Sequence, residues 1–159
     1  MSGDSFLKGV ELINAKGDTI QGDVAVRDKV VALFFSAEWC PYCRDFLPAL
    51  KKFYEEANAE TPQLEIVLVS SDNSSEEHFA YLKDKQGPWW SIPFEGTLRT
   101  ELKLKYETAA RKELQEIGLV ERKGGLPSLL IVTQAGDVVD RNGVEAVEKD
   151  GIKALEKWL

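Results

Sequence analysis

Two continuous apolar runs constrain the fold most strongly. Val30–Phe35 reads V-V-A-L-F-F, and Leu64–Val69 reads L-E-I-V-L-V. Both are rich in β-forming side chains, and neither alternates as a strand with one wet face would. They therefore predict strands buried on both faces, as in a parallel sheet. The 159 residues are enough to bury such a sheet, and we expect a single domain over residues 1–159.

Amphipathic segments follow both strands. Cys40–Ala57 carries an apolar stripe at helical spacing, which predicts a helix. Ser74-x-x-Glu77 has the form of a capping box and opens a shorter helix. Leu98–Ile117 is expected to form one long helix, whereas two prolines make Gly87–Pro93 irregular. The side chains expected to face the core from the shorter helix and from a final helix after Asp150 are Phe79, Leu82, Ile152, Leu155 and Trp158.

Short strands are expected near both ends of the chain. Val10–Ile13 and Asp18–Ile20 flank an N-A-K-G turn and predict a hairpin, and Val24–Val26 predicts a further short strand. Ser128–Thr133 and Asp137–Asp140 flank Q-A-G and predict a closing hairpin. Strands that alternate with helices pair in parallel, and the closing hairpin adds an antiparallel edge. The sequence thus predicts an α/β fold with a mixed central β-sheet, helices on both faces and an N-terminal β-hairpin.

Both cysteines lie in the stretch S-A-E-W-C-P-Y-C-R, residues 36–44. Cys40 begins the expected helix, and Pro41 suits the first turn because its missing N–H is no loss there. Unpaired N–H groups and the helix dipole favour a thiolate at Cys40, which is the reactive form. Cys43 lies one turn later on the same face, so the two sulfurs can form a disulfide. We predict that Cys40, at an exposed tip, attacks a target disulfide and that Cys43 resolves the mixed disulfide.

Two other roles for the cysteine pair are a zinc half-site and a structural disulfide. A closed zinc site needs four ligands, and the chain offers two cysteines and one histidine, His78, which is expected to face solvent. A disulfide closing so short a loop adds little stability. In a reducing compartment a paired C-x-x-C is more often redox-active than structural. We therefore predict a redox pair and no metal site.

Pro127 is the second chemical signal. Leu126-Pro127 opens the expected Ser128–Thr133 strand, and a proline is unusual at the start of an interior strand. An ordinary trans proline is one interpretation. Beside a C-x-x-C and this strand order we expect a cis peptide bond, which would leave the backbone of Leu126 open to an incoming peptide.

Composition excludes several classes of partner. The net charge of −7 disfavours binding to nucleic acid or to anionic membranes, because no basic field neutralises phosphates. No apolar run approaches the length of a membrane span. The N-terminal M-S-G-D-S-F-L-K lacks the layout of a signal peptide. These features predict a cytoplasmic protein, with the nucleus as the alternative.

Taken together, these motifs resemble the thioredoxin superfamily, and more closely its tryparedoxin/nucleoredoxin-like branch. The resemblance implies a thioredoxin fold and dithiol–disulfide exchange, with Cys40 as nucleophile, Cys43 as resolving thiol and Pro127 as the cis-proline. It also implies that substrate is contacted by Trp39, which flanks the nucleophile, by Leu126, and by Pro41 and Tyr42, which tune the redox potential. The stretches that carry the resemblance are F-F-S-A-E-W-C-P-Y-C-R (34–44), V-L-V-S-S-D (67–72), P-W-W-S-I-P-F (88–94) and G-G-L-P-S-L-L-I-V (124–132).

The chain departs from these families at several positions. Phe34 stands where typical thioredoxins carry a buried Asp as proton relay. Asp72 lies just past the Leu64–Val69 strand and is a candidate relay, or else a helix cap or a solvated side chain. Ser71 and Asn73 replace a Trp and an acid of trypanosomal tryparedoxins, which argues against trypanothione as reductant. Thr108–Lys123 resembles an insertion near the active-site rim, which either shapes a partner surface or lengthens a helix.

The leading functional hypothesis is a thiol–disulfide oxidoreductase that reduces protein disulfides. No flavin or nicotinamide site is visible, so we expect no bound cofactor and electrons from an external thiol or an upstream reductase. Expected partners are disulfide-containing proteins such as peroxiredoxins. The alternatives are a redox-regulated binding module of the nucleoredoxin type and a glutathione-dependent, glutaredoxin-like reductase, since C-P-Y-C is the usual glutaredoxin motif. Iron–sulfur assembly between two chains is disfavoured by Pro41.

Overall fold

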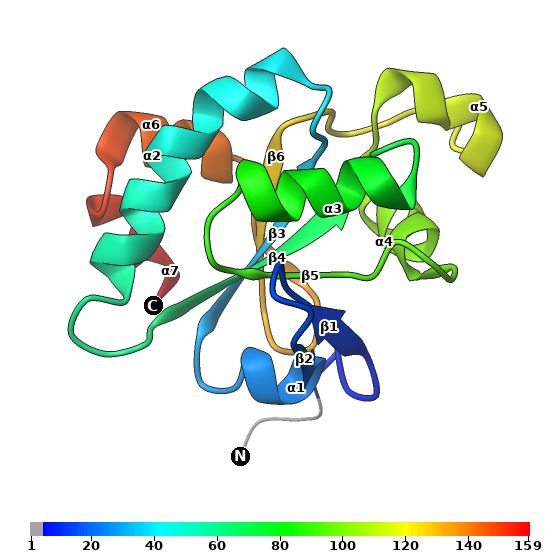
Figure 1. Cartoon of the computed structure of the whole chain (residues 1–159). Helices are drawn as coiled ribbons and strands as arrows, with labels where there is room; N and C mark the ends of the chain where they lie inside the picture. Colours follow the sequence, from blue (N-terminus) through cyan, green and yellow to red (C-terminus); the bar gives the residue numbers. More distant parts are fainter. Residues whose placement is uncertain (1–4) are drawn as a thin grey trace.

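The computed structural model describes residues 5–159 and is built on a mixed seven-stranded sheet (Figure 1). The strand order is β2-β1-β5-β4-β3-β6-β7. The central strands β3 and β4 run parallel, and β6 pairs antiparallel with β3. The expected mixed sheet and N-terminal hairpin are therefore confirmed. The strands are β1 (Glu11–Ile13), β2 (Thr19–Gln21), β3 (Val30–Ser36), β4 (Leu64–Ser70), β5 (Trp90–Ser91), β6 (Ser128–Val132) and β7 (Val138–Asp140).

Helices cover both faces of the sheet, as predicted. One apolar cluster joins α2, α3, α6 and α7 to the face that bears Phe34 and Ile66. A second cluster joins α1 and α4 to the face that bears Leu33 and Phe35. The helical segments are α1 (Gly22–Ala25), α2 (Pro41–Ala57), α3 (Ser75–Asp84), α4 (Leu98–Tyr106), the 3₁₀ turn η1 (Arg111–Glu113), α5 (Leu114–Ile117), α6 (Gly143–Asp150) and α7 (Lys153–Trp158).

Phe34 lies at the centre of the first cluster. It is fully buried, and its ring makes edge contacts with Phe46, at a centroid distance of 6.0 Å, and with Trp89, at 6.3 Å. Aromatic pairs in this geometry add to the free energy gained from burial alone. The position that would hold a buried carboxylate in a typical thioredoxin is thus part of a dry aromatic core.

The strand predicted at Val24–Val26 is wrong. This stretch forms the short helix α1 and its C-terminal cap at Val26. The chain turns sharply after β2, because the Gly22 N–H donates to the Val10 carbonyl oxygen, 2.7 Å away. A Cβ on Gly22 would lie 2.7 Å from the Cβ of Leu7, so only glycine permits this approach. Tertiary packing therefore overrides the β propensity of the two valines.

The single long helix predicted over Leu98–Ile117 is also wrong. Helix α4 ends at Tyr106, where Glu107 takes a left-handed conformation with φ of 52°. The following residues fold back, so that Thr108 forms a β-bridge with Gly124. Between these points the chain forms only η1 and the short helix α5. No glycine or proline marks the break, so the helical pattern of the sequence does not indicate that α4 ends there.

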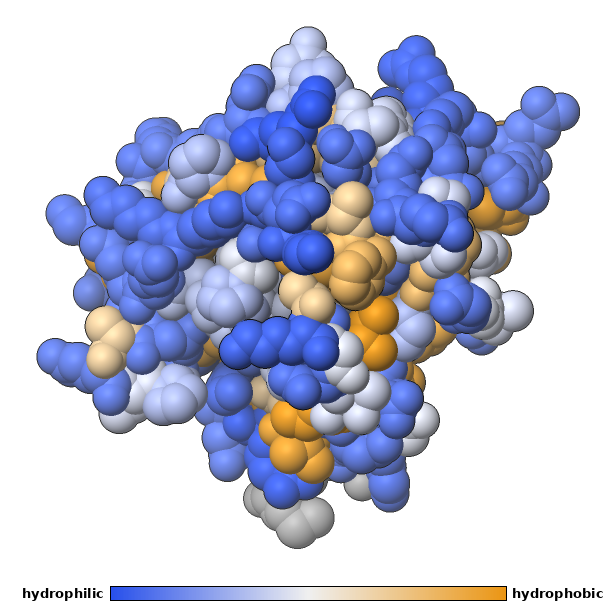
Figure 2. All heavy atoms as spheres, in the orientation of Figure 1, coloured by the Kyte–Doolittle hydropathy of each residue, from blue (hydrophilic) through white to orange (hydrophobic). Residues whose placement is uncertain are grey.

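Two smaller predictions also fail, and one helix was not predicted. Phe79 is 50% exposed, because α3 turns His78 and Tyr81 inward alongside Leu82. Phe79 lines a hollow of about 440 Å³, and Figure 2 shows apolar residues among polar ones near the centre of its view. Ile152 is 36% exposed in the turn before α7, and helix α6 was not predicted. No helix within residues 5–159 is long and apolar enough to cross a membrane.

Candidate functional site

The two cysteines lie where β3 gives way to α2, at the upper end of the sheet in Figure 1. Cys40 is the N-cap of α2, and Pro41 occupies the first turn, as predicted. The backbone N–H of Cys43 donates to the sulfur of Cys40 over 3.3 Å. Both cysteines are free thiols in this structure. The start of the helix thus directs one of its unpaired N–H groups at the Cys40 sulfur, which favours negative charge there.

The surroundings of the two sulfurs differ from the expected exposed tip. Cys40 is 4% exposed, because it packs in a small apolar cluster with Ala37 and Cys43, bordered by Trp39 and Leu126. Cys43 is fully buried, and burial raises the pKa of its thiol to about 12. The two cysteines therefore have different surroundings. Cys40 receives a hydrogen-bond donor, whereas burial favours the protonated form of Cys43.

Trp39 is held from both its edge and its face. Its indole N–H donates to the carbonyl oxygen of Ser71, 3.0 Å away. The ammonium of Lys112 lies 3.9 Å from the ring centroid, which is a cation–π contact. Directly after the nucleophile in the sequence, Pro41 is exposed and Tyr42 is 74% exposed. Their expected contact with a substrate stays a prediction.

The peptide bond between Leu126 and Pro127 is cis, as predicted. Leu126 packs against the Cys40–Cys43 cluster although more than eighty residues separate them in sequence. Strand β6 begins at Ser128, so the backbone of Leu126 lies outside the sheet. The topology thus places Leu126, just before β6, beside the two cysteines.

Asp72 lies just past β4 and is 5% exposed. One carboxylate oxygen accepts from the backbone N–H of Glu38 at 2.7 Å, and the other accepts from the hydroxyl of Ser70 at 2.6 Å. Its interpretation as a solvated side chain or a helix cap is therefore wrong, and Ser74 caps α3 instead. Burial raises the pKa of Asp72. Asp72 fixes the loop that carries Trp39, and its role as a proton relay stays a prediction.

A buried ion pair fastens the Thr108–Lys123 segment to this end of the sheet. The Lys103 ammonium lies 2.5 Å from one carboxylate oxygen of Glu113, and the Lys103 side chain is 2% exposed. The other Glu113 oxygen accepts from the Ser71 hydroxyl at 2.6 Å and from the Ala110 N–H at 3.0 Å. Burial opposes the negative charge, but Lys103 and these donors hold the pKa of Glu113 below its ordinary value.

Sequence reasoning did not find Lys103, Lys112 or Glu113. In one continuous helix, Lys103 and Glu113 would lie about 15 Å apart along the axis, so their spacing carries no signal of contact. Their contact depends on the left-handed turn at Glu107, which the sequence does not mark. The expected position of the segment at the active-site rim is nevertheless correct.

His78 is 2% exposed, which contradicts its expected position in solvent. Its Nε2 shares a hydrogen bond of 2.8 Å with the Ser91 hydroxyl. Burial, followed by the charge of Arg99, lowers the pKa of His78 to about 4. Within residues 5–159, no group of three or more His, Cys, Asp and Glu side chains is arranged to hold a metal ion.

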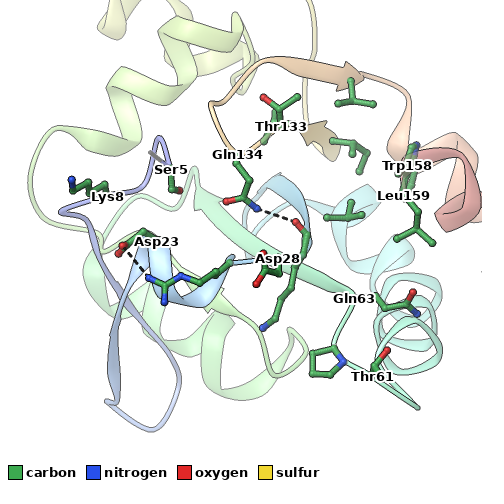
Figure 3. A pocket seen from close by; sticks show the side chains of 17 residues that line it. Ser5, Lys8, Asp23, Asp28, Thr61, Gln63, Thr133, Gln134, Trp158 and Leu159 are labelled. Atoms are coloured by element: carbon green, nitrogen blue, oxygen red, sulfur yellow. Dashed lines mark hydrogen bonds and ion pairs between the residues drawn. The ribbon is translucent and has the colours of Figure 1, made fainter. Parts of the chain in front are cut away.

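One large hollow lies away from the cysteines. Its volume is about 830 Å³, and Figure 3 shows Asp28, Gln63, Gln134 and Leu159 among its lining residues. It borders Val30, at the start of β3, whereas the cysteines follow the end of that strand. Neither cysteine lines it, so size alone does not locate the redox chemistry.

The chain is similar in sequence to proteins of known family. A family model described as thioredoxin-like matches residues 28–138. Human nucleoredoxin-like protein 1 is 31% identical over 138 residues, which cover 84% of this chain and 58% of the human protein. Probable nucleoredoxin 2 of Oryza sativa subsp. japonica is 30% identical over 155 residues, which cover 96% of this chain and 34% of the rice protein. The chain therefore spans less than two thirds of either relative.

Solved structures show the same likeness. Thioredoxin from Wuchereria bancrofti has a TM-score of 0.76 at 37% identity, covering 97% of this chain and 96% of that chain. Tryparedoxin I from Leishmania major has a TM-score of 0.73 at 29% identity, covering 95% of this chain and 92% of that chain. These likenesses confirm the expected thioredoxin fold and the resemblance to the tryparedoxin/nucleoredoxin-like branch.

Proposed function

Because the chain belongs to the thioredoxin-like family of oxidoreductases, we propose that it reduces disulfides in other proteins. The observation that carries the proposal is the asymmetric Cys40–Cys43 pair at the start of α2. One sulfur accepts a backbone N–H, and the other is a fully buried thiol. The cis peptide bond at Leu126-Pro127 lies beside the pair and leaves backbone groups outside the sheet for a bound peptide.

The reaction consists of two exchanges. The Cys40 thiolate attacks one sulfur of the target disulfide, whose S–S bond breaks as the departing thiolate takes up a proton. The thiol of Cys43 then loses its proton and attacks the Cys40 sulfur, which breaks the mixed disulfide and releases the second target thiolate. Two electrons have moved to the target, and the chain holds a Cys40–Cys43 disulfide. An external dithiol, or a reductase, returns both electrons.

Substrate and electron donor follow from the same proposal. Trp39, Pro41 and Tyr42 would contact the target on one side of Cys40, and the Leu126 backbone on the other. Peroxiredoxins are proposed targets, because their catalytic cycle leaves a protein disulfide to be reduced. A small thiol or a cytoplasmic or nuclear reductase is the proposed donor, and no bound cofactor is needed.

Insulin reduction tests the proposal. Turnover is measured first with dithiothreitol and then with thioredoxin reductase and NADPH, beside a Cys40→Ser variant. We expect many insulin disulfides to be reduced per molecule of the wild type, and none above background with Cys40→Ser. A wild type that oxidises readily but turns over with neither donor would contradict the proposal.

A redox-regulated binding module is the second candidate. The observation in its favour is the segment anchored by Glu113, which forms a surface next to Trp39. Such a module would change its affinity for a partner with the oxidation state of Cys40 and Cys43, and would not turn over. The insulin assay therefore separates the two candidates.

A further inference from the structure

A polar hollow of about 210 Å³ lies beside Trp39. Its walls come from the loop after β4, from Phe94, from the first two turns of α4 and from η1 and α5. Arg99, Lys103 and Lys112 supply its positive charges. The volume is enough for a carboxylate with its hydration and too small for a whole tripeptide. Any ligand would therefore insert one group and keep the rest outside.

Two of the three cations have no carboxylate partner. The Arg99 guanidinium donates to the carbonyl oxygens of Phe94 and Ser70, each 3.0 Å away, and stacks on the Phe94 ring. Lys112 donates to the amide oxygen of Asn73 at 2.9 Å. Within the part of the chain that the structure describes, no carboxylate lies within 4.0 Å of either cation. Arg99 is thus held in place by neutral acceptors, and the carboxylates of Glu113 and Asp72 act on its charge only from beyond contact distance.

Three carboxylates share the same walls. Glu113 is neutralised by Lys103, and both oxygens of Asp72 accept hydrogen bonds from Glu38 and Ser70. Glu116 is exposed at the mouth and opposes a bound anion. The three cations and the three carboxylates carry equal and opposite formal charge, so the hollow has no net charge that would hold a dianion such as phosphate. A bound carboxylate would instead be stabilised by direct contact with Arg99 and Lys112.

We propose that this hollow binds one carboxylate of the molecule that exchanges disulfides at Cys40. Lys112 connects the two places, because its ammonium contacts the ring of Trp39 and lines the hollow. The carboxylate is either an acidic side chain beside the target disulfide of a protein or a carboxylate of a small thiol donor. The inference deepens the proposed function and rests on it for the reaction, but its binding test needs no turnover.

The first test uses S-methylglutathione, whose methylated sulfur cannot exchange disulfides. It is titrated into the reduced protein while the indole N–H signal of Trp39 is followed by NMR and assigned with Trp39→Phe. We expect a saturable shift with the free acid and none with its diethyl ester. Lys112→Gln should weaken the affinity about two- to fivefold, which is typical of one partly exposed charge. Glu116→Gln should tighten it, and Lys52→Gln, a matched exposed lysine on α2, should leave it unchanged.

The second test separates the two sources of the carboxylate. Linear peptides that carry an S-methylated cysteine next to Asp, Asn or Lys replace the tripeptide in the same titration. Binding that requires Asp assigns the hollow to acidic protein substrates, and binding of the tripeptide alone assigns it to a small thiol. The proposal is overturned if neither probe shifts the Trp39 signal, or if the ester binds as well as the acid. A failed insulin assay would overturn the proposed reaction and leave these binding results standing.

Discussion

At the scale of single residues, the chemistry depends on how differently the fold surrounds two identical side chains. Cys40 accepts a backbone N–H at the first turn of α2, and Cys43 is buried one turn deeper. Phe34 replaces the polar group that typical thioredoxins place below this pair, so no carboxylate from β3 is available to take the Cys43 proton. The second exchange is therefore the step that the surroundings make difficult.

The rate of that second exchange should depend steeply on pH. Because burial raises the pKa of Cys43 to about 12, the reactive thiolate is a small fraction that grows with pH. We expect release of a trapped mixed disulfide to accelerate about tenfold per pH unit between about pH 7 and pH 9. Stopped-flow single turnovers measure this rate. A rate that is flat across that range would show that a neighbouring base removes the proton.

Two buried groups outside the site should affect the stability of the folded chain in opposite directions as pH changes. Burial raises the pKa of Glu65 to about 7, so the folded chain holds its proton more tightly than the unfolded chain does. Stability is then lost as pH rises from about 4.5 to 7. Burial lowers the pKa of His78 to about 4, so stability is lost as pH falls from about 6.5 to 4.

Substitution separates these two contributions. Relative to wild type, Glu65→Gln should gain on the order of 2 kcal/mol as pH rises through this range, and His78→Gln should gain a similar amount as pH falls. Urea unfolding of the three proteins at several pH values measures the differences. Two variants whose stability runs parallel to that of wild type would contradict the account.

At the scale of elements, the segment between α4 and β6 shows what the sequence could and could not predict. Apolar runs and helical stripes were sufficient for β3, β4, α2 and the closing hairpin, because each of these is determined by local periodicity. The break at Glu107 was not predictable, because a left-handed residue that is not glycine costs energy locally and is stabilised by contacts made later in the chain. The ion pair between Lys103 and Glu113 is one such contact.

The site shows the same division. Cys40, Cys43 and the cis peptide bond at Pro127 were predicted from motifs, and the structure brings them together. The hydrogen bonds of Asp72, the burial of Cys40 and the cation over Trp39 depend on loops that meet only in three dimensions. Sequence patterns do not predict such contacts between distant loops.

Breaking the buried ion pair should destabilise this segment strongly. Lys103→Met leaves Glu113 buried without its cation, which costs about 3 kcal/mol or more for such a pair. We expect a lower unfolding midpoint and faster amide exchange in residues 108–123. The control is Lys123→Gln in the same segment, whose exposed pair with Glu107 spans 3.5 Å and should contribute little. Equal effects of the two variants would show that the anchor lies elsewhere.

At the scale of the whole molecule, one sheet separates two apolar clusters and brings distant segments together at a single end. The starts of α2 and β6 and the segment after α4 all lie at that end (Figure 1). The large hollow of Figure 3 lies at the other. The core beneath the cysteines is aromatic, so the position of Phe34 requires an apolar side chain.

Restoring the acid of typical thioredoxins should therefore fail in this chain. Phe34→Asp would place a carboxyl group among Phe46 and Trp89 without a partner, and we expect it to cost more than about 4 kcal/mol. Phe34→Leu, which keeps the site apolar, should cost about 1–2 kcal/mol. Urea unfolding of both variants measures the difference. A stable, active Phe34→Asp protein would show that the core tolerates the usual relay.

The most direct test of the central claim is to trap the intermediate on a protein target. Cys43→Ser is reacted with insulin, and the covalent adduct is digested and mapped by mass spectrometry. The account predicts a mixed disulfide between Cys40 and an insulin cysteine, which dithiothreitol releases and which Cys40→Ser does not form. An adduct formed through Cys43 in the Cys40→Ser variant, with none through Cys40, would contradict the assignment of nucleophile and resolving thiol.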